Sequence, residues 1–141
     1  MKKIAVIYWS GTGNTEAMAA DVAEGARNAG AEVEVLPCAA FDASMLDALD
    51  AVAFGCPAMG AEELEETEFL PMFEACKPHL NGKRIALFGS YGWGDGEGMR
   101  TWEESCAGLG CVFAADSVIC SEAPDETAAA ACKALGAALA A

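Results

Sequence analysis

Short apolar runs alternate with amphipathic segments along the whole chain, which predicts strands and helices in turn. The apolar runs are rich in β-branched and aromatic residues, and we expect strands over 2–9, 32–36, 50–56, 83–90 and 111 to about 120. Between them, helical spacing predicts helices over 14–29, 68–76, 99–109 and 125–139, with a loop or short helix over 41–49. This alternation is typical of a doubly wound α/β fold. We expect one domain over residues 1–141, with a five-stranded parallel sheet and helices on both faces.

Three loops are expected at the edge of this sheet where ligands bind, outside the carboxyl ends of the strands. They follow the first, third and fourth expected strands and cover residues 10–15, 57–66 and 91–98. These loops also hold the most unusual residues of the chain, so we assign the candidate site to them.

The first loop reads Ser10-Gly11-Thr12-Gly13-Asn14-Thr15. Its glycines allow a tight turn in which several backbone N–H groups point inward at the positive end of the next helix. Hydroxyl and amide side chains add donors and no cation is present, so neutral dipoles would hold a phosphate here. A P-loop needs a lysine that this loop lacks, and the dinucleotide fingerprint needs a small residue where Glu16 stands. The alternative is an ordinary polar turn with helix caps.

The third loop places Trp93 between Gly92 and Gly94. An indole among glycines is suited to stacking on a planar ligand, whose edge the glycine N–H groups can bind. The alternative is a tryptophan folded back into the core.

The second loop offers three contacts to such a planar ligand. Met59 can touch the opposite side of a ring, Gly60 permits a change of backbone conformation, and Glu62 can accept from a ring N–H. Taken alone, the loop is typical of an acidic surface turn, formed by Glu62, Glu63, Glu65 and Glu66.

Charge limits the range of partners. The chain has 22 acidic and 8 basic residues and a net charge of −14, which argues against nucleic acid and anionic membranes as partners. A basic protein surface is favoured, although solubility alone also explains the charge. The first apolar run, Ile4 to Trp9, is too short to cross a bilayer and lacks the layout of a signal peptide. We therefore expect a cytoplasmic protein, and a monomer.

The seven cysteines and the single histidine, His79, lack the spacing of a metal site. We expect the cysteines to be free thiols that act as small buried apolar residues, and His79 to lie isolated at the surface.

Three strings carry a family resemblance. They are Tyr8-Trp9-Ser10-Gly11-Thr12-Gly13-Asn14-Thr15-Glu16, Gly55-Cys56-Pro57-Ala58-Met59-Gly60, and Leu87-Phe88-Gly89-Ser90-Tyr91-Gly92-Trp93-Gly94-Asp95-Gly96. In this order and at this spacing, the chain resembles the short-chain flavodoxins of anaerobic, clostridial-like bacteria.

The resemblance implies the flavodoxin-like strand order 2-1-3-4-5 and non-covalently bound flavin mononucleotide (FMN). It places the phosphate on the first loop, the ring between Met59 and Trp93, Glu62 at the ring N3–H and backbone N–H groups near Gly92 at O2. The family's Gly60 carbonyl turns toward the reduced ring and stabilises its semiquinone. The cofactor-binding residues so implied are Ser10, Gly11, Thr12, Gly13, Asn14, Thr15, Pro57, Ala58, Met59, Gly60, Ala61, Glu62, Ser90, Tyr91, Gly92, Trp93, Gly94 and Asp95.

Two positions depart from the family pattern. Ala61 stands where many relatives have a residue that tolerates a turn, and a left-handed conformation there would cost on the order of 1 kcal/mol. Pro57 replaces a serine found in some relatives, so no further phosphate hydroxyl is expected from it.

The function that follows is a low-potential one-electron carrier, not an enzyme. It would shuttle between the semiquinone and hydroquinone forms of FMN and dock transiently on basic-surfaced redox proteins through an acidic face. The alternatives are a flavodoxin-like NAD(P)H-dependent flavin or quinone reductase, an activator of ribonucleotide reductase, and a response-regulator receiver. A receiver would need acidic residues where Ser10, Cys56 and Pro57 stand.

Overall fold

A computed structural model of the protein describes residues 2–11, 13–57, 64–91, 97–121 and 124–141. Its elements, in chain order, are β1 (Lys3–Tyr8), α1 (Asn14–Asn28), β2 (Glu32–Pro37), η1 (Cys38–Ala40), η2 (Ala43–Ala48), β3 (Ala51–Gly55), α2 (Phe69–Cys76), η3 (Lys77–His79), β4 (Arg84–Tyr91), α3 (Glu97–Gly108), β5 (Val112–Phe113), β6 (Val118–Ser121) and α4 (Glu126–Ala140), where η marks a 3-10 helix. The strands form one parallel sheet in the order β2-β1-β3-β4-β5, and β6 also pairs with β4. The expected strand order is confirmed.

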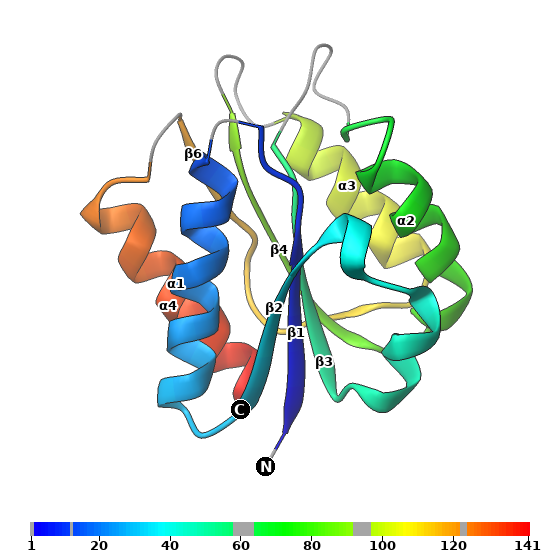
Figure 1. The fold of residues 1–141 in the computed structure, drawn as a ribbon, viewed down its shortest axis with the longest axis horizontal. Helices are drawn as coiled ribbons and strands as arrows, with labels where there is room; N and C mark the ends of the chain where they lie inside the picture. Colours follow the sequence, from blue (N-terminus) through cyan, green and yellow to red (C-terminus); the bar gives the residue numbers. More distant parts are fainter. Residues whose placement is uncertain (1, 12, 58–63, 92–96, 122–123) are drawn as a thin grey trace.

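Helices cover both faces of this sheet. Figure 1 shows α1 and α4 on one side, and α2 and α3 on the other. Residues of β3 are buried throughout because the strand lies between β1 and β4 and under helices on both faces, whereas the edge strand β2 is only partly covered. Coverage on both faces therefore explains why Ala51–Gly55, within the strand predicted over 50–56, contains no polar side chain.

The two faces are packed with different side chains. Against α2 and α3, Phe69 and Phe73 lie around Trp102, with ring centroids 5.6 and 5.7 Å from the indole. Against α1 and α4 the core is built mainly from small and aliphatic side chains, which include Ala19, Val22, Ala23, Ala26 and Leu135. Aromatic side chains fill the space between the sheet and the helices on the first face. On the second face, the helices approach each other closely and leave room only for small side chains.

Close approach of α1 and α4 depends on two glycines. A Cβ on Gly25 would lie 1.9 Å from the carbonyl oxygen of Lys133, and a Cβ on Gly136 would lie 1.9 Å from that of Val22. Both neighbours are backbone atoms, so a side chain at either position is accommodated only by moving a helix. The two helices therefore pack backbone against backbone.

The expected fifth strand, 111 to about 120, is found in two pieces. Phe113 pairs with Ile85 and Val118 pairs with Phe88, so five steps along this strand match three along β4. Two additional residues leave the ladder between β5 and β6, as in a β-bulge. The chain bends at Ala114 and Ala115 between the two pieces, Ala115 and Asp116 are exposed, and the Ser117 hydroxyl donates to Glu103 at 2.8 Å.

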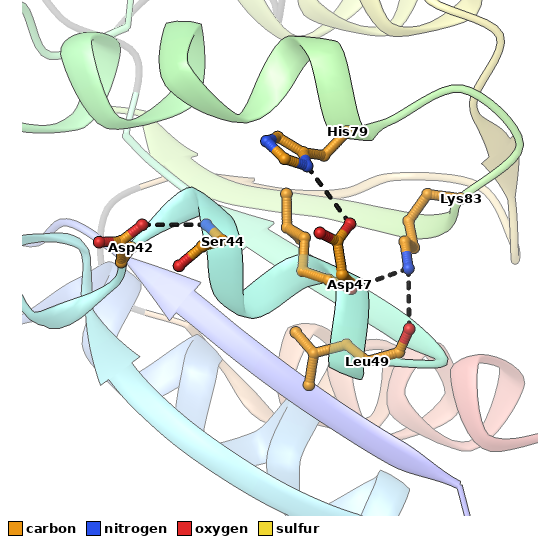
Figure 2. A network of polar contacts seen from close by, with 7 residues as sticks. Asp42, Ser44, Asp47, Leu49, His79 and Lys83 are labelled. Carbon is orange, nitrogen blue, oxygen red and sulfur yellow. Dashed lines mark hydrogen bonds and ion pairs between the residues drawn. The ribbon is translucent and has the colours of Figure 1, made fainter.

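The segment expected as a loop or short helix over 41–49 forms η2, after the shorter η1. Figure 2 shows the side chains that hold η2 in place. Asp42 accepts from the backbone N–H of Ser44 at 2.9 Å, and Lys83 Nζ donates to the carbonyl oxygens of Leu46 at 2.9 Å and Leu49 at 2.8 Å. A carboxylate at its start and an ammonium group at its end stabilise this short helix.

His79 lies near the surface, as expected, but it is not isolated. Its Nδ1 lies 3.3 Å from Asp47 Oδ1, beside the end of η2 (Figure 2). The histidine therefore joins η3 to η2.

All seven cysteines are free, and five of them are buried. Burial raises the pKa of the thiols of Cys56, Cys76 and Cys132 to about 12. They therefore stay protonated and pack as small apolar side chains, as the sequence predicts.

We expect Gly136→Ala to lower the free energy of unfolding by about 2 to 3 kcal/mol, because the added methyl group meets backbone atoms that cannot yield. Gly108→Ala is the matched control, since a Cβ there has no neighbour within 4 Å. Urea unfolding of both variants measures the difference. Equal stability of the two variants would contradict the tight α1–α4 packing.

Candidate functional site

The carboxyl ends of β1, β3 and β4 meet at one edge of the sheet, at the top of Figure 1. Backbone hydrogen bonds continue the ladder past the strands there. Trp9 N–H donates to Gly55 O at 3.0 Å, and Cys56 N–H donates to Phe88 O at 3.2 Å. The roots of the three predicted loops are therefore held side by side.

The first loop enters α1 through Gly13. This glycine has φ of 94°, in the left-handed region that favours glycine, and its N–H donates to Ser10 Oγ at 3.0 Å. Among the described residues no side chain caps α1. The first-turn N–H groups of the helix thus lie at its positive end with no side-chain acceptor from the described part of the chain, which suits an anion.

Two buried hydroxyls meet beside this helix end. Thr15 on α1 and Ser90 near the end of β4 are 1% and 6% exposed, and their Oγ atoms lie 3.1 Å apart. One hydroxyl donates to the other, which leaves one O–H free to donate elsewhere. The contact ties the first loop to the strand that leads into the third.

Trp9 supports the first loop from below. A Cβ on Gly11 would lie 3.0 Å from the Trp9 ring, so the loop backbone passes close over the indole. The indole N–H donates to Glu68 Oε1 at 3.2 Å, just before α2 begins. The tryptophan thereby links the first loop to the end of the second.

Glu65 overturns the expectation of a surface turn for 62–66 in part, because its side chain is only 6% exposed. Its carboxylate accepts from the backbone N–H groups of Thr67, Glu68 and Phe69 at 2.9, 2.7 and 3.0 Å, and from the Thr67 hydroxyl. Its carbonyl oxygen accepts from Leu70 N–H at 2.8 Å. The residue after Leu70 is Pro71, which has no N–H. Glu65 therefore accepts nearly all the backbone N–H groups that lack a partner at the start of α2.

These hydrogen bonds set the charge state of Glu65. Burial opposes its ionisation, but the Thr67 hydroxyl and the N–H groups of Phe69, Glu68 and Thr67 outweigh burial and lower its pKa to about 2. The side chain is therefore a carboxylate throughout the physiological pH range. Glu66, by contrast, is exposed as expected.

Acidic side chains prevail around this edge of the sheet. Glu16 in the first turn of α1 accepts from the Tyr8 hydroxyl at 3.0 Å, and burial together with this carboxylate raises the pKa of Tyr8. The ion pairs Lys77–Glu74 and Lys133–Glu24 lie elsewhere. Within the described ranges, no cluster of three or more histidine, cysteine or acidic side chains is placed to hold a metal ion.

The structure describes the position of only some of the predicted cofactor-binding residues. The described ones, which cluster at the edge of the sheet as expected, are Ser10, Gly11, Gly13, Asn14, Thr15, Pro57, Ser90 and the backbone of Tyr91. Outside the described residues lie Thr12, Ala58, Met59, Gly60, Ala61, Glu62, Gly92, Trp93, Gly94 and Asp95. The stacking of a ring between Met59 and Trp93 stays a prediction.

Sequence reasoning missed Glu65 as a structural anchor. The signal was present, because an acidic residue stands shortly before an apolar helical run that carries Pro71 in its first turn. It was hard to recognise because the neighbouring Glu66 and Glu68 are the same residue type as Glu65 and differ from it in being exposed.

Comparisons with known proteins agree with this geometry. Residues 6–136 match the family model described as Flavodoxin. The chain is 46% identical to a flavodoxin of Clostridium beijerinckii over 121 residues, covering 86% of this chain and 88% of that one. It is 42% identical to a flavodoxin of Megasphaera elsdenii over 133 residues, covering 94% and 95%. The solution structure of the two-electron reduced Megasphaera elsdenii flavodoxin superposes with a TM-score of 0.89 over 97% of this chain and 98% of that one.

The lowered pKa of Glu65 predicts a loss of stability in acid. A carboxyl group whose pKa falls from 4.5 to about 2 on folding stabilises the protein above pH 4.5, by up to about 3 kcal/mol, and this contribution fades as the pH falls toward 2. Unfolding of Glu65→Gln should therefore differ most from wild type at neutral pH and converge with it in acid. Glu66→Gln should parallel wild type; convergence there as well would mean that Glu65 is not the cause.

Proposed function

The chain belongs to the flavodoxin family, and from that premise we propose which of its residues hold the cofactor and tune it. It is an FMN-binding electron carrier, not an enzyme, and it passes electrons to partner proteins. When bound, FMN supplies a ring that takes up and releases electrons one at a time. The protein's own task is to hold that ring, shield it and set its reduction potentials.

We propose that the start of α1 holds the FMN phosphate. The single observation that carries this assignment is the first turn of α1 behind the left-handed Gly13, which no side chain of the described residues caps, with the Thr15–Ser90 hydroxyl pair beside it. Residues 10–15 include no cation, so hydroxyl, amide and backbone dipoles would bind the dianion. The donor set fits a phosphate monoester. Its further members would be Ser10, Thr12 and Asn14.

The ring would lie between the second and third loops. β3 and β4 are paired in parallel, with Gly55 opposite Phe88, so the two strands that lead toward the second and third loops lie next to one another. We propose that Met59 and Trp93 contact the two faces of the ring and that Glu62 accepts from its N3–H. Pro57, half-buried at the end of β3, would begin this wall of the site.

We further propose that the carrier works at low potential. The net charge of −14 and the acidic side chains of Glu16, Glu65 and Glu68 near the loop roots oppose the addition of negative charge at this edge. The same charge favours transient docking of redox proteins with basic surfaces. No helix among the described residues has the length and apolarity to span a bilayer. We propose a monomeric protein of the cytoplasm.

Binding of FMN and of riboflavin, which lacks the phosphate, tests the phosphate assignment. Ser10→Ala and Thr15→Val should each weaken FMN roughly tenfold or more, because a hydrogen bond to a charged group is lost. Riboflavin affinity should stay within about twofold of wild type in the same flavin-fluorescence titrations, since the ring contacts are kept. Equal losses for both ligands would place the phosphate elsewhere.

Salt tests the electrostatic part of the proposal. We expect the potential of the second electron to become less negative, by tens of millivolts, as ionic strength rises and screens the acidic groups. Glu62→Gln should raise the same potential at low salt and reduce its salt dependence. Spectroelectrochemical titrations at two salt concentrations measure both effects, and a potential that ignores salt and this substitution would contradict the charge argument.

A further inference from the structure

The end of α3 forms a closed turn between two cysteines. Gly110 N–H donates to Ala107 O at 3.1 Å, and Cys111 N–H donates to Cys106 O at 3.3 Å. Gly110 has φ of 84°, in the left-handed region. These two hydrogen bonds and this glycine define a Schellman motif, in which the residue after the glycine folds back against the last turn of the helix.

A Schellman motif brings the side chains of its first and last residues together, and here both are cysteines. Cys106 is buried in the core on the side of α2 and α3, and the half-buried Cys111 packs against the same core. The two thiols share a side-chain hydrogen bond. At the end of α1 the same motif pairs Ala26 with Ala31, whose N–H donates to Ala26 O at 3.1 Å. Alanines are therefore sufficient for such a turn, and the fold does not require thiols there.

The backbone holds Cys111 in place on both of its sides. The carbonyl oxygen of Gly110 accepts from Gly82 N–H at 2.8 Å, and Val112 N–H donates to Lys83 O at 2.9 Å. The other cysteine of the pair is fixed within α3. A disulfide requires the two Cβ atoms to lie about 4 Å apart, and two thiols already held in contact need little movement to meet that requirement.

The two thiols are unequal in acidity and in exposure. Their hydrogen bond raises the pKa of Cys106, and burial adds to this increase. The same hydrogen bond lowers the pKa of Cys111, although burial opposes the decrease. Cys111 is also the more exposed of the two. The thiolate, which is the reactive form, therefore forms at Cys111, while Cys106 stays a thiol beside it.

We propose that Cys106 and Cys111 are a redox-modification site, which hydrogen peroxide converts to a disulfide and a dithiol reductant restores. The Cys111 sulfur first attacks one peroxide oxygen and the O–O bond breaks. Cys111 becomes a sulfenic acid, and the departing hydroxide takes up the proton that Cys111 has lost to form water. The Cys106 sulfur then attacks the Cys111 sulfur, the S–S bond forms and the S–O bond breaks. The second hydroxide leaves with the Cys106 proton as water.

The overall reaction oxidises two thiols by two electrons and reduces one peroxide to two molecules of water. The resulting bridge would join the end of α3 to the start of β5. The flavin takes no part in these steps, so the inference is independent of the proposed FMN site.

Mass spectrometry of the holoprotein tests the site. The protein with oxidised FMN is treated with an equimolar amount of hydrogen peroxide and then alkylated in denaturant. Cleavage after Glu104 and Asp116 isolates a peptide, 105–116, that contains Cys106 and Cys111 and no other cysteine. We expect this peptide to lose about 2 Da and to take up no alkylating agent, and a dithiol reductant to restore both alkylated cysteines.

Three variants separate the roles of the two thiols. Cys111→Ser should abolish the bridge and slow the oxidation of Cys106 by about tenfold or more, because the remaining thiol stays protonated. Cys106→Ala should leave Cys111 as a sulfenic acid that dimedone captures. Cys120→Ser is the matched control, because Cys120 is also half-buried but its thiol donates to Met18 Sδ at 3.5 Å. Its bridge should form within about twofold of the wild-type rate.

Several outcomes would overturn the proposal. They are alkylation of both cysteines after peroxide treatment, a sulfinic acid on Cys111 without a bridge, and a bridge formed between other cysteines instead. Oxidation of Cys106 at the wild-type rate in Cys111→Ser, or no capture by dimedone in Cys106→Ala, would overturn the assigned order of attack. If Cys106→Ala does not fold, Cys111→Ser, which changes the half-buried position, carries the test together with the wild type.

Discussion

Backbone N–H groups in the first turn of a helix have no partner within that helix, and three helices of this chain meet the requirement in three ways. At α4, Asp125 accepts from Ala128 N–H at 2.8 Å. At α2, the buried Glu65 serves several donors at once. At α1, no capping side chain is found in the described part of the chain. α1 is the helix whose first turn we propose to be completed by a dianionic cofactor, so the same local requirement is met by side chains at two helices and, in this proposal, by the ligand at the third.

The order of elements was predictable because a parallel strand that is buried on both faces consists of a short, continuous run of apolar residues. β3 is the clearest case, since all five of its residues are buried. The division of the last strand was not predictable in the same way: Ala114 and Ala115 extend the apolar run beyond Phe113, the last paired residue of β5. The hydropathy pattern indicates which residues are buried. A bulge instead depends on how the strand is aligned with β4, and the local sequence does not determine that alignment.

The candidate site divides along a similar line. The first loop was predictable in detail because its chemistry is local: glycines, hydroxyls and a helix start lie next to one another in sequence. The partnership of Thr15 with Ser90 joins residues 75 positions apart. The buried Glu65 differs from the exposed Glu66 in its contacts with Thr67, Glu68 and Phe69, which the residue type alone does not reveal. The identity of the cofactor was predicted from the family resemblance. The structure adds the contacts between the described residues that flank the loops in which that cofactor is proposed to lie.

The glycine contact between α1 and α4 gives the two sides of the sheet unequal tolerance for evolutionary change. On the side of Phe69, Phe73 and Trp102, one large side chain can shrink while a neighbour grows, and the helices can stay where they are. Between Gly25 and Gly136 there is no side-chain volume to exchange, because the nearest atoms belong to the opposing backbone. Sequence drift is therefore expected to be concentrated on the aromatic side, while α1, the helix that follows the first loop, keeps its distance from the sheet.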